Sequence, residues 1–232
     1  MNAPVSFRLG YVPGVTPGKW ARMWADRRPD VPLDLVAAST DEAVEQVRAG
    51  TLDAGLVRLP IDRTGLHAIP LYTETTVVLV PKDHLLTAAE ETTVAELADA
   101  VVLRPTDDPL VWRDTGPGQP AAYEPPTTTE AVELVAAGVG LLVLPQSLAR
   151  LHHRRDLTYR PLTDAPTSSV VLTWPDAENS DLMEEFIGIV RGRTVNSTRT
   201  PAQRAEPTKR DARPAKKTPA RRTPARRGTR RR

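Results

Sequence analysis

Apolar residues recur at helical spacing in two segments of the chain that nearly repeat each other. Residues 39–50 (STDEAVEQVRAG) and 127–138 (TTTEAVELVAAG) are identical at eight of twelve positions. Each segment opens with a hydroxyl residue followed three positions later by glutamate, which is a capping-box signature, and closes on a glycine that stops the helix. Each then runs into an apolar stretch that ends at Leu-Pro, at residues 52–60 and 141–145. The sequence therefore encodes one unit, a capped helix followed by a buried strand, in two places, and this predicts two similar lobes with a cleft between them.

Strand and helix patterns alternate along the rest of the chain. Strand, helix and strand in short succession indicate sheets built from βαβ units, so the fold class is α/β. Thr16 is expected to cap the first helix, with Pro17 at the first helical position. The expected strands cover residues 5–12, 31–38, 67–86, 101–105, 121–124 and 157–175, and the expected helices cover residues 19–28, 92–100, 146–152 and 179–193.

Charge is divided sharply along the chain. The formal net charge is +2, but 15 of the 31 Lys and Arg residues and only 2 of the 29 acidic residues lie in residues 193–232. The last 40 residues therefore carry a net charge of +13, and the preceding 192 residues carry −11. The motif TPARR occurs twice in this basic tail, which has frequent proline and almost no large apolar residue. Such a segment cannot bury enough surface to offset its chain entropy, so we expect it to be disordered.

Composition excludes several kinds of site. The chain has no cysteine, so it can form neither a disulfide nor a thiolate metal site. The N-terminus lacks the pattern of a signal peptide, and no stretch approaches the ~20 apolar residues of a membrane span, which favours a cytoplasmic protein. The four histidines are scattered, and no nucleophile elbow, phosphate loop or dinucleotide fingerprint occurs. We therefore expect neither an enzyme nor a bound metal or cofactor.

The order of these patterns resembles the effector-binding (substrate-binding) domain of LysR-type transcriptional regulators. The resemblance rests on FRLGYVPG, WADRRPDVPLDLVAAS, LVRLP after GTLDAG, PLYTETTVVLVPKDHLL, LVAAGVGLLVLP and a closing run that ends in MEEFIGIV. It implies a type 2 periplasmic-binding-protein fold, in which two lobes, each a mostly parallel sheet flanked by helices, are joined by two crossing segments. Lobe I is then residues 1–74 plus 166–192, lobe II residues 75–165, and the tail residues 193–232.

One departure from the family concerns DNA binding. Regulators of this family carry a winged helix-turn-helix before the effector-binding domain. The first strand of this chain begins near Val5, so that reader of DNA is expected to be absent. The resemblance therefore implies ligand sensing more directly than promoter recognition.

The candidate ligand site is the cleft between the lobes. Helix N-termini offer unpaired N–H groups and a partial positive charge, which predicts a small anionic organic ligand. Arg58 and Arg104 end strands, and residues beyond the carboxyl ends of strands line the crevice of open α/β sheets, where arginine can bind a carboxylate. The alternative interpretation is that the hydroxyls only cap their own helices and that each arginine pairs with a nearby acid. The candidate ligand-binding residues are Thr16, Ser39, Thr40, Arg58, Arg104, Thr106, Thr127 and Thr128.

The basic tail resembles the Lys/Arg-Pro-Ala tails of actinobacterial nucleoid-associated proteins. Such a segment is expected to bind DNA phosphates through counterion release, with little reading of base sequence. RNA, an anionic membrane surface and the acidic body of the chain are the alternative partners. The candidate nucleic-acid-binding residues are Lys216, Lys217, Arg221, Arg222, Arg226, Arg227, Arg230, Arg231 and Arg232.

The leading hypothesis is a LysR-like ligand sensor that acts in transcriptional regulation and associates with the nucleoid through its tail. Effector domains of this family pair side by side, so a homodimer or pairing with related regulators is expected. One alternative is a solute-binding protein of a transport system, which shares the fold but would need a signal peptide. A second is a partner subunit that modulates full-length LysR-type regulators, and a third is a degenerate protein that no longer binds a ligand.

Overall fold

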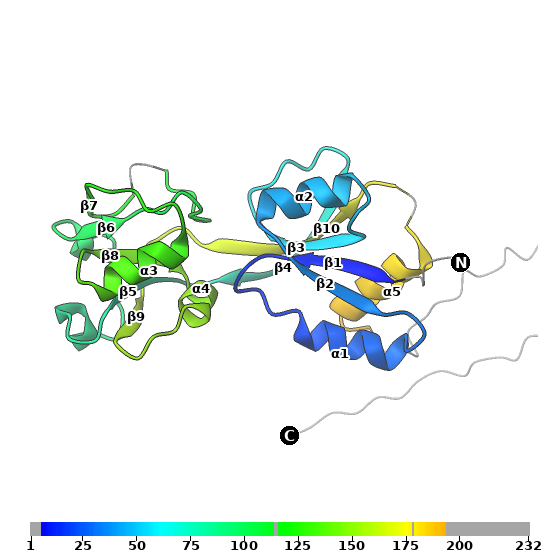
Figure 1. Ribbon diagram of the computed structural model, residues 1–232, viewed down its shortest axis with the longest axis horizontal. Helices are drawn as coiled ribbons and strands as arrows, with labels where there is room; N and C mark the ends of the chain where they lie inside the picture. The colour runs from blue at the N-terminus through cyan, green and yellow to red at the C-terminus, as the bar shows by residue number, and fades with distance from the viewer. Residues whose placement is uncertain (1–5, 114–115, 178, 194–232) are drawn as a thin grey trace, which may run out of the picture. The chain divides into compact units, whose positions relative to one another are not determined.

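The computed structural model describes residues 6–113, 116–177 and 179–193. The basic tail and its candidate nucleic-acid-binding residues lie outside the described residues, apart from Arg193. Within the described part, two five-stranded sheets form two lobes, and the chain crosses twice between them (Figure 1).

Lobe I is a sheet with helices on both faces. Its elements are β1 (Phe7–Tyr11), α1 (Gly18–Arg27), β2 (Leu33–Ala37), α2 (Thr40–Arg48), β3 (Ala54–Arg58), β4 (Leu66–Glu74), β10 (Ser168–Pro175) and α5 (Asp181–Val190). The strand order is β2-β1-β3-β10-β4, in which β1, β2 and β3 run parallel and β10 is antiparallel to both of its neighbours. Helix α2 covers one face of the sheet, while α1 and α5 pack together on the other (Figure 1).

Lobe II has the same plan. Its elements are β5 (Thr76–Pro81), the 3-10 helices η1 (Leu85–Ala88) and η2 (Ala95–Leu97), β6 (Val101–Leu103), β7 (Gln119–Pro120), α3 (Thr128–Ala136), β8 (Leu141–Pro145), α4 (Gln146–Leu151) and β9 (Leu157–Pro161). The order is β7-β6-β8-β5-β9, in which β6, β7 and β8 run parallel and β5 is antiparallel to both neighbours. Each sheet is therefore mixed, which refines the expectation of mostly parallel sheets. The antiparallel strands, β5 and β10, are those that arrive from the other lobe, so they start where the parallel strands end.

The two repeated segments form the same unit, one in each lobe, as α2–β3 and α3–β8. The prediction of a capped helix followed by a buried strand is therefore confirmed. Ser39 caps α2 in a complete capping box with Glu42, and the Thr127 hydroxyl accepts a hydrogen bond from the N–H of Glu130 at α3. The glycine that follows each helix has φ of 71° or 75°, the left-handed conformation that ends a helix without strain.

Three local predictions are wrong. Helix α1 begins at Gly18 with Pro17 as its N-cap residue and has no side-chain cap, so Thr16 does not cap it. Pro17 itself adopts helical angles, φ −72° and ψ −6°, which leaves Thr16 outside the first turn.

The helix expected over residues 92–100 contains only the short turn η2, because Thr92 pairs with the returning chain. The strand expected at residues 121–124 lies earlier, at β7.

Each lobe has its own apolar core. In lobe I the rings of Phe7, Trp24 and Phe186 pack with centroids 4.9 to 5.9 Å apart and join β1 to α1 and α5. The buried Trp24 indole N–H donates to the carbonyl of Val31 at 2.8 Å, so its polar group is satisfied. Lobe II has aliphatic clusters on both faces of its sheet, because successive residues of the fully buried β8 point to opposite faces. Among the described residues, no helix has the length and hydropathy needed to cross a membrane.

Two glycines are expected to respond to alanine in opposite directions. Gly138 has φ of 75° and open space around an added Cβ, so Gly138→Ala should cost about 1–2 kcal/mol of unfolding free energy through backbone strain. Gly188 lies inside α5, and the nearest atom to an added Cβ is Arg193 Cδ at 4.0 Å. Gly188→Ala should therefore raise the unfolding free energy by up to about 1 kcal/mol. Urea unfolding followed by circular dichroism measures both changes, and changes of the same sign would contradict this assignment.

Candidate binding site at the lobe junction

Both sheets present the carboxyl ends of their parallel strands to the junction of the lobes. Strand β4 runs in the same direction as β3 and ends at Glu74, where the chain crosses to lobe II. Thr76, the first residue of β5, pairs with Pro145, the last residue of β8, so β8 and its parallel neighbour β6 also end at the crossing. Ligands in open α/β sheets bind beyond the carboxyl ends of the strands. The segments that follow β1, β2, β3 and β6 therefore form the candidate site.

The N-terminus of α2 lies at this edge because the helix follows β2 directly. The N–H of Ser39 donates to Glu42 Oε2 at 2.8 Å, and the N–H of Glu42 donates to Ser39 Oγ at 3.3 Å. Hydrogen bonds from the Ser39 backbone and hydroxyl hold the pKa of the Glu42 carboxyl below its usual value. The N–H groups of Thr40 and Asp41, in the first turn of α2, have no acceptor among the described residues.

The N-terminus of α3 is held at the corresponding edge of lobe II by an aspartate that sequence reasoning did not assign to the site. Asp107 Oδ1 accepts hydrogen bonds from the N–H and the hydroxyl of the buried Thr128, at 2.7 and 2.8 Å. Thr127 Oγ1 accepts from the N–H of Glu130 at 3.2 Å, while the Glu130 carboxylate accepts from the Tyr123 hydroxyl at 2.7 Å and does not close a capping box. The sequence signal that could have identified Asp107 is its place as an acid shortly after β6. A negative charge is favourable near a helix N-terminus.

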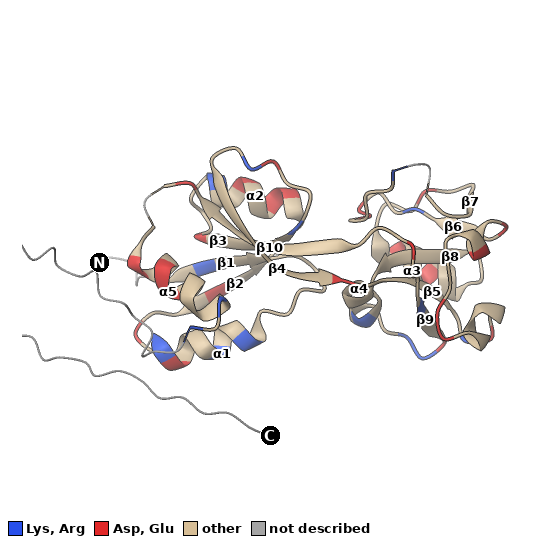
Figure 2. Cartoon of the chain, turned by 180° about the vertical axis from the view of Figure 1, so that it is seen from behind, with Lys and Arg blue, Asp and Glu red and all other residues tan. Residues whose placement is uncertain are grey.

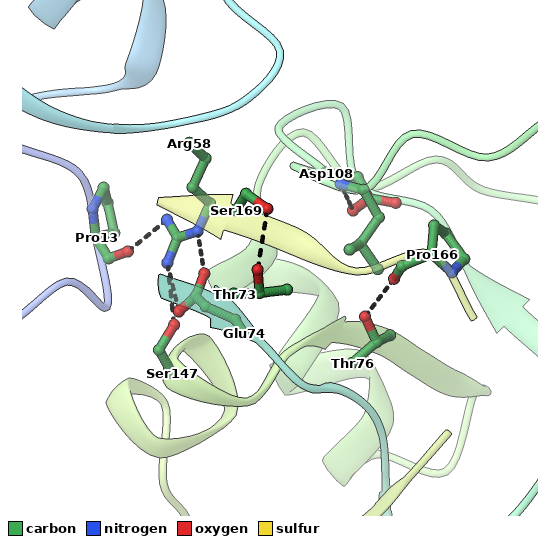
Figure 3. A network of polar contacts seen from close by, with 10 residues as sticks. Pro13, Arg58, Thr73, Glu74, Thr76, Asp108, Ser147, Pro166 and Ser169 are labelled. Carbon is green, nitrogen blue, oxygen red and sulfur yellow. Dashed lines mark hydrogen bonds and ion pairs between the residues drawn. The ribbon is translucent and has the colours of Figure 1, made fainter. Parts of the chain in front are cut away.

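Arg58, the last residue of β3, is buried at the junction, and its guanidinium contacts both lobes (Figure 3). Its Nε donates to Glu74 Oε2 at 2.7 Å, and its Nη2 lies 3.4 Å from Glu74 Oε1. Nη1 donates to the carbonyl of Pro13 at 2.7 Å, and Nη2 donates to Ser147 Oγ of α4 at 3.0 Å. Only 5% of the Arg58 side chain and 4% of the Glu74 side chain are exposed. Sequence reasoning selected Arg58 but missed Glu74 and Ser147, which no periodicity or motif marks.

The remaining candidate residues bond locally or face solvent. Arg104, directly after β6, donates from Nη2 to the carbonyl of Pro117 at 3.4 Å, and its buried Nε has no partner among the described residues. Thr106 is exposed and donates to the carbonyl of Pro125 from its N–H, at 2.9 Å, and from its hydroxyl, at 3.4 Å. Thr16 is exposed on the loop after β1. In the part of the chain that the structure describes, none of these three side chains is hydrogen-bonded to the guanidinium network.

Three predicted anion positions already hold a carboxylate of the chain itself. Glu42 occupies the N-terminus of α2, Asp107 that of α3, and Glu74 the guanidinium of Arg58. The donors at the junction therefore suit a carboxylate in number and direction. A ligand anion would use the remaining N–H groups of α2 or displace one of these three carboxylates.

A fourth acid, Asp108, lies beside the junction (Figure 3). Burial raises the pKa of Asp108 to about 6, and the neighbouring Asp107 carboxylate adds to the rise. The N–H of Leu110, which donates to Asp108 Oδ1 at 2.9 Å, and the charge of Arg104 act in the opposite direction. Asp108 is thus an acid whose charge changes in mildly acidic solution.

Known proteins share this domain across its length. A family model described as LysR substrate binding domain matches residues 6–194. The chain belongs to this family. The Hca operon transcriptional activator HcaR of Escherichia coli is 28% identical over 204 residues, which cover 82% of this chain and 68% of HcaR. The transcriptional regulator AlsR of Bacillus subtilis is 26% identical over 178 residues, covering 72% of this chain and 59% of AlsR.

Both relatives are transcriptional regulators, so this LysR domain belongs to a family of regulators and not of enzymes. A probable hydrogen peroxide-inducible genes activator of Mycobacterium avium is 30% identical over 152 residues, covering 60% of this chain and 49% of the relative. The chain therefore spans about half to two thirds of these regulators.

Solved LysR effector-binding domains have the same fold. The BenM effector binding domain with its effector benzoate aligns with a TM-score of 0.68 at 20% identity, over 82% of this chain and 92% of that chain. The oxidised form of OxyR aligns with a TM-score of 0.67 at 23% identity, over 82% of this chain and 97% of that chain. At these identities the likeness shows the two-lobed fold alone.

Asp108 is expected to make the LysR domain less stable as the pH rises. Its pKa is about 6 in the folded state against an ordinary value of 3.8, so its favourable contribution is complete below about pH 4 and is lost as the pH rises through 6. Asp108→Asn keeps the acceptor for the N–H of Leu110 but cannot ionise. The unfolding free energy of Asp108→Asn relative to the parent chain should therefore rise between pH 4 and pH 8, by at most about 3 kcal/mol.

Urea unfolding at the two pH values measures this difference. Asp99→Asn, at an exposed position, controls for the general effect of removing one negative charge. A relative stability of Asp108→Asn that does not change between pH 4 and pH 8 would show that Asp108 titrates like an exposed acid.

Proposed function

We propose that this chain is the effector-sensing part of a LysR-type transcriptional regulator and that it binds a small organic anion at the lobe junction. The observation that carries the proposal is the placement of the two repeated units, whose helix N-termini lie at facing carboxyl edges of the two sheets. Helix N-termini favour a carboxylate through their N–H groups and partial charge. Two such ends on separate lobes can hold one ligand from both sides.

The donors at the junction support an anionic ligand. The α3 end holds the carboxylate of Asp107, and the α2 end holds that of Glu42. Because Glu42 is exposed, it can leave the helix end without leaving a buried charge unpaired. A ligand carboxylate in its place would meet the N–H groups of Ser39, Thr40 and Asp41. Benzoate, the effector bound in the BenM structure, is a carboxylate, and that structure has the same fold.

The chain has no cysteine, which favours ligand binding over thiol oxidation as the signal.

The proposed assembly is a cytoplasmic dimer, or a pair with related regulators. Strand β2 is an edge strand of its sheet, and Leu35 within it is 42% exposed. An edge that has no partner strand among the described residues and carries an exposed apolar side chain supports pairing with a second chain. The chain covers only part of each regulator that it resembles. We also propose that the whole protein reads a promoter.

The proposed role of the basic tail is to bind nucleic acid and associate the protein with the nucleoid. In the described part, acidic and basic residues are interspersed over both lobes (Figure 2), and the first 192 residues carry a net charge of −11. The tail, with a net charge of +13, is therefore the segment suited to phosphate backbones. Its repeated Arg pairs would neutralise phosphates and release counterions without reading bases.

Ligand binding is tested on the full chain with a panel of small organic carboxylates that includes benzoate. Thr40→Val removes a hydroxyl at the junction end of α2. Thr51→Val removes a hydroxyl beyond the other end of the same helix, where it binds the carbonyl of Gln46. We expect Thr40→Val to weaken binding of a stabilising carboxylate about 3- to 10-fold because one hydrogen bond is removed, and Thr51→Val to leave the affinity unchanged.

Thermal shift identifies the stabilising carboxylate, and calorimetry gives the affinities. Equal affinities for the two valine variants would place the ligand away from the α2 N-terminus. If neutral or cationic compounds stabilise the chain while no carboxylate does, the ligand is not an anion.

Nucleic-acid binding is tested by fluorescence anisotropy with duplex DNA at several salt concentrations. The affinity of the full chain should fall steeply with salt. Replacing the nine candidate Lys and Arg residues of the tail by Gln should lower the slope of log K against log salt by about 0.9 for each phosphate that the variant no longer neutralises. A slope that is flat for the parent chain would contradict a phosphate-binding tail, and stronger binding to an RNA duplex of equal length would indicate RNA as the partner.

A further inference from the structure

The guanidinium of Arg58 is the point where four segments of the chain meet. Arg58 ends β3, and its acceptors lie in the loop after β1, at the end of β4 and in α4 (Figure 3). The hydrogen bond from Nη2 to Ser147 Oγ, 3.0 Å long, is the one that reaches an element of lobe II. The guanidinium of Arg58, a residue of lobe I, therefore donates a hydrogen bond directly to a side chain of lobe II.

Glu74 fixes the direction in which Arg58 points. Both side chains are more than nine-tenths buried, and the Nε to Oε2 distance is 2.7 Å. Breaking such a pair would leave an uncompensated buried charge, so the guanidinium keeps its orientation. With Nε directed at Glu74 and Nη1 directed at the carbonyl of Pro13, Nη2 is left facing α4.

Gly14 brings the lobes into direct contact at the same point. Its φ is 84°, and an added Cβ would lie 2.8 Å from Ser147 Oγ, 3.1 Å from Arg58 Nη2 and 3.2 Å from Leu148 Cδ2. The loop after β1 therefore packs closely on α4, and glycine satisfies both the backbone conformation and the lack of space. The close approach therefore surrounds the hydrogen bond from Arg58 to Ser147 and adds a packing contact with Leu148.

Helix α4 belongs to lobe II and lies at the crossing. Leu148 and Ala149 are buried in the apolar cluster between the helices and the sheet of that lobe. The N–H of Gln146 donates to the carbonyl of Thr75 at 2.9 Å, in the single residue between β4 and β5. A rotation of lobe II about the crossing segments would therefore change the distance from Ser147 to Arg58.

We propose that Arg58 and Ser147, with Gly14 beside them, form an interlobe clamp that holds the two lobes in one relative orientation. Ser147 is a positioning residue that acts through Arg58 and needs no contact with a ligand. One hydrogen bond of ordinary net strength biases an equilibrium about fivefold, a bias that a ligand with different affinities for two orientations can overcome. The clamp goes beyond the ligand site proposed above and does not depend on the chemical class of that ligand.

The clamp can be tested on the full chain, which has no cysteine and so accepts two spin labels at chosen sites. Ala49 and Ala137 are equivalent exposed C-cap residues of α2 and α3. Ala49→Cys and Ala137→Cys with spin labels report the interlobe distance by pulsed electron paramagnetic resonance. Ser147→Ala removes the lobe II acceptor. Ser169→Ala is the matched control, because its hydroxyl lies 3.3 Å from Thr73 Oγ1 within lobe I.

We expect Ser147→Ala to broaden the distance distribution and to raise the population outside the parent range about fivefold. Ser169→Ala should reproduce the parent distribution. Gly14→Ala places a methyl group between the lobes and should shift the mean distance. A Ser147→Ala distribution that coincides with that of Ser169→Ala would overturn the clamp. Should Ser147→Ala fail to fold, a parent-like distribution for Gly14→Ala would overturn it instead. These distances are measured without ligand, so failure of every carboxylate to bind would leave the result on the clamp intact.

Discussion

The buried ion pair of Arg58 and Glu74 constrains the elements around the lobe junction. Taking both charges out of water is costly, so such a pair persists where further hydrogen bonds satisfy the remaining donors. The carbonyl of Pro13 and the hydroxyl of Ser147 supply them at 2.7 and 3.0 Å. Each lobe has its own apolar cluster, and the contact between the lobes at this point combines the hydrogen bond from Arg58 to Ser147 with the close approach of Gly14 to α4. If the proposed clamp holds the lobes, their orientation would respond to small changes in charge and hydrogen bonding at this point.

The proposed anion site would work by exchange of carboxylates. Glu42, Asp107 and Glu74 occupy donors that the fold would otherwise offer to a ligand. A ligand carboxylate that binds at these donors would compete with a carboxylate of the chain, whereas one held by the remaining N–H groups of α2 would not. The three acids differ in how easily they can leave, since Glu42 is exposed and Glu74 is buried. The fold is shared with other LysR effector-binding domains, so we expect the choice of ligand to depend on side chains at this junction.

The repeated units show how one local pattern acquires different surroundings in the two lobes. Helix α2 closes its capping box with Glu42, whereas Glu130 of α3 turns to the Tyr123 hydroxyl. Asp107 then supplies the acid at α3 from a different segment. Both helices still end on a left-handed glycine and lead into a buried strand. The lobes are thus alike in local structure and different in the side chains that they present to the junction.

Sequence by itself determined the α/β class, the two repeated units and the capped starts of α2 and α3. Caps, apolar period and terminal glycine act within one or two helical turns, so a local pattern is sufficient to predict them. The same kind of local pattern gave a wrong cap for α1, because the helical conformation of Pro17 leaves Thr16 outside the helix. Only the tertiary structure decided that β5 and β10 enter antiparallel and that the junction donors have acidic partners. The partners of Arg58 are 16, 45 and 89 positions away, and that of Thr128 is 21 positions away. Contacts between segments so far apart follow from the strand order and the crossing of the chain, which no local pattern encodes.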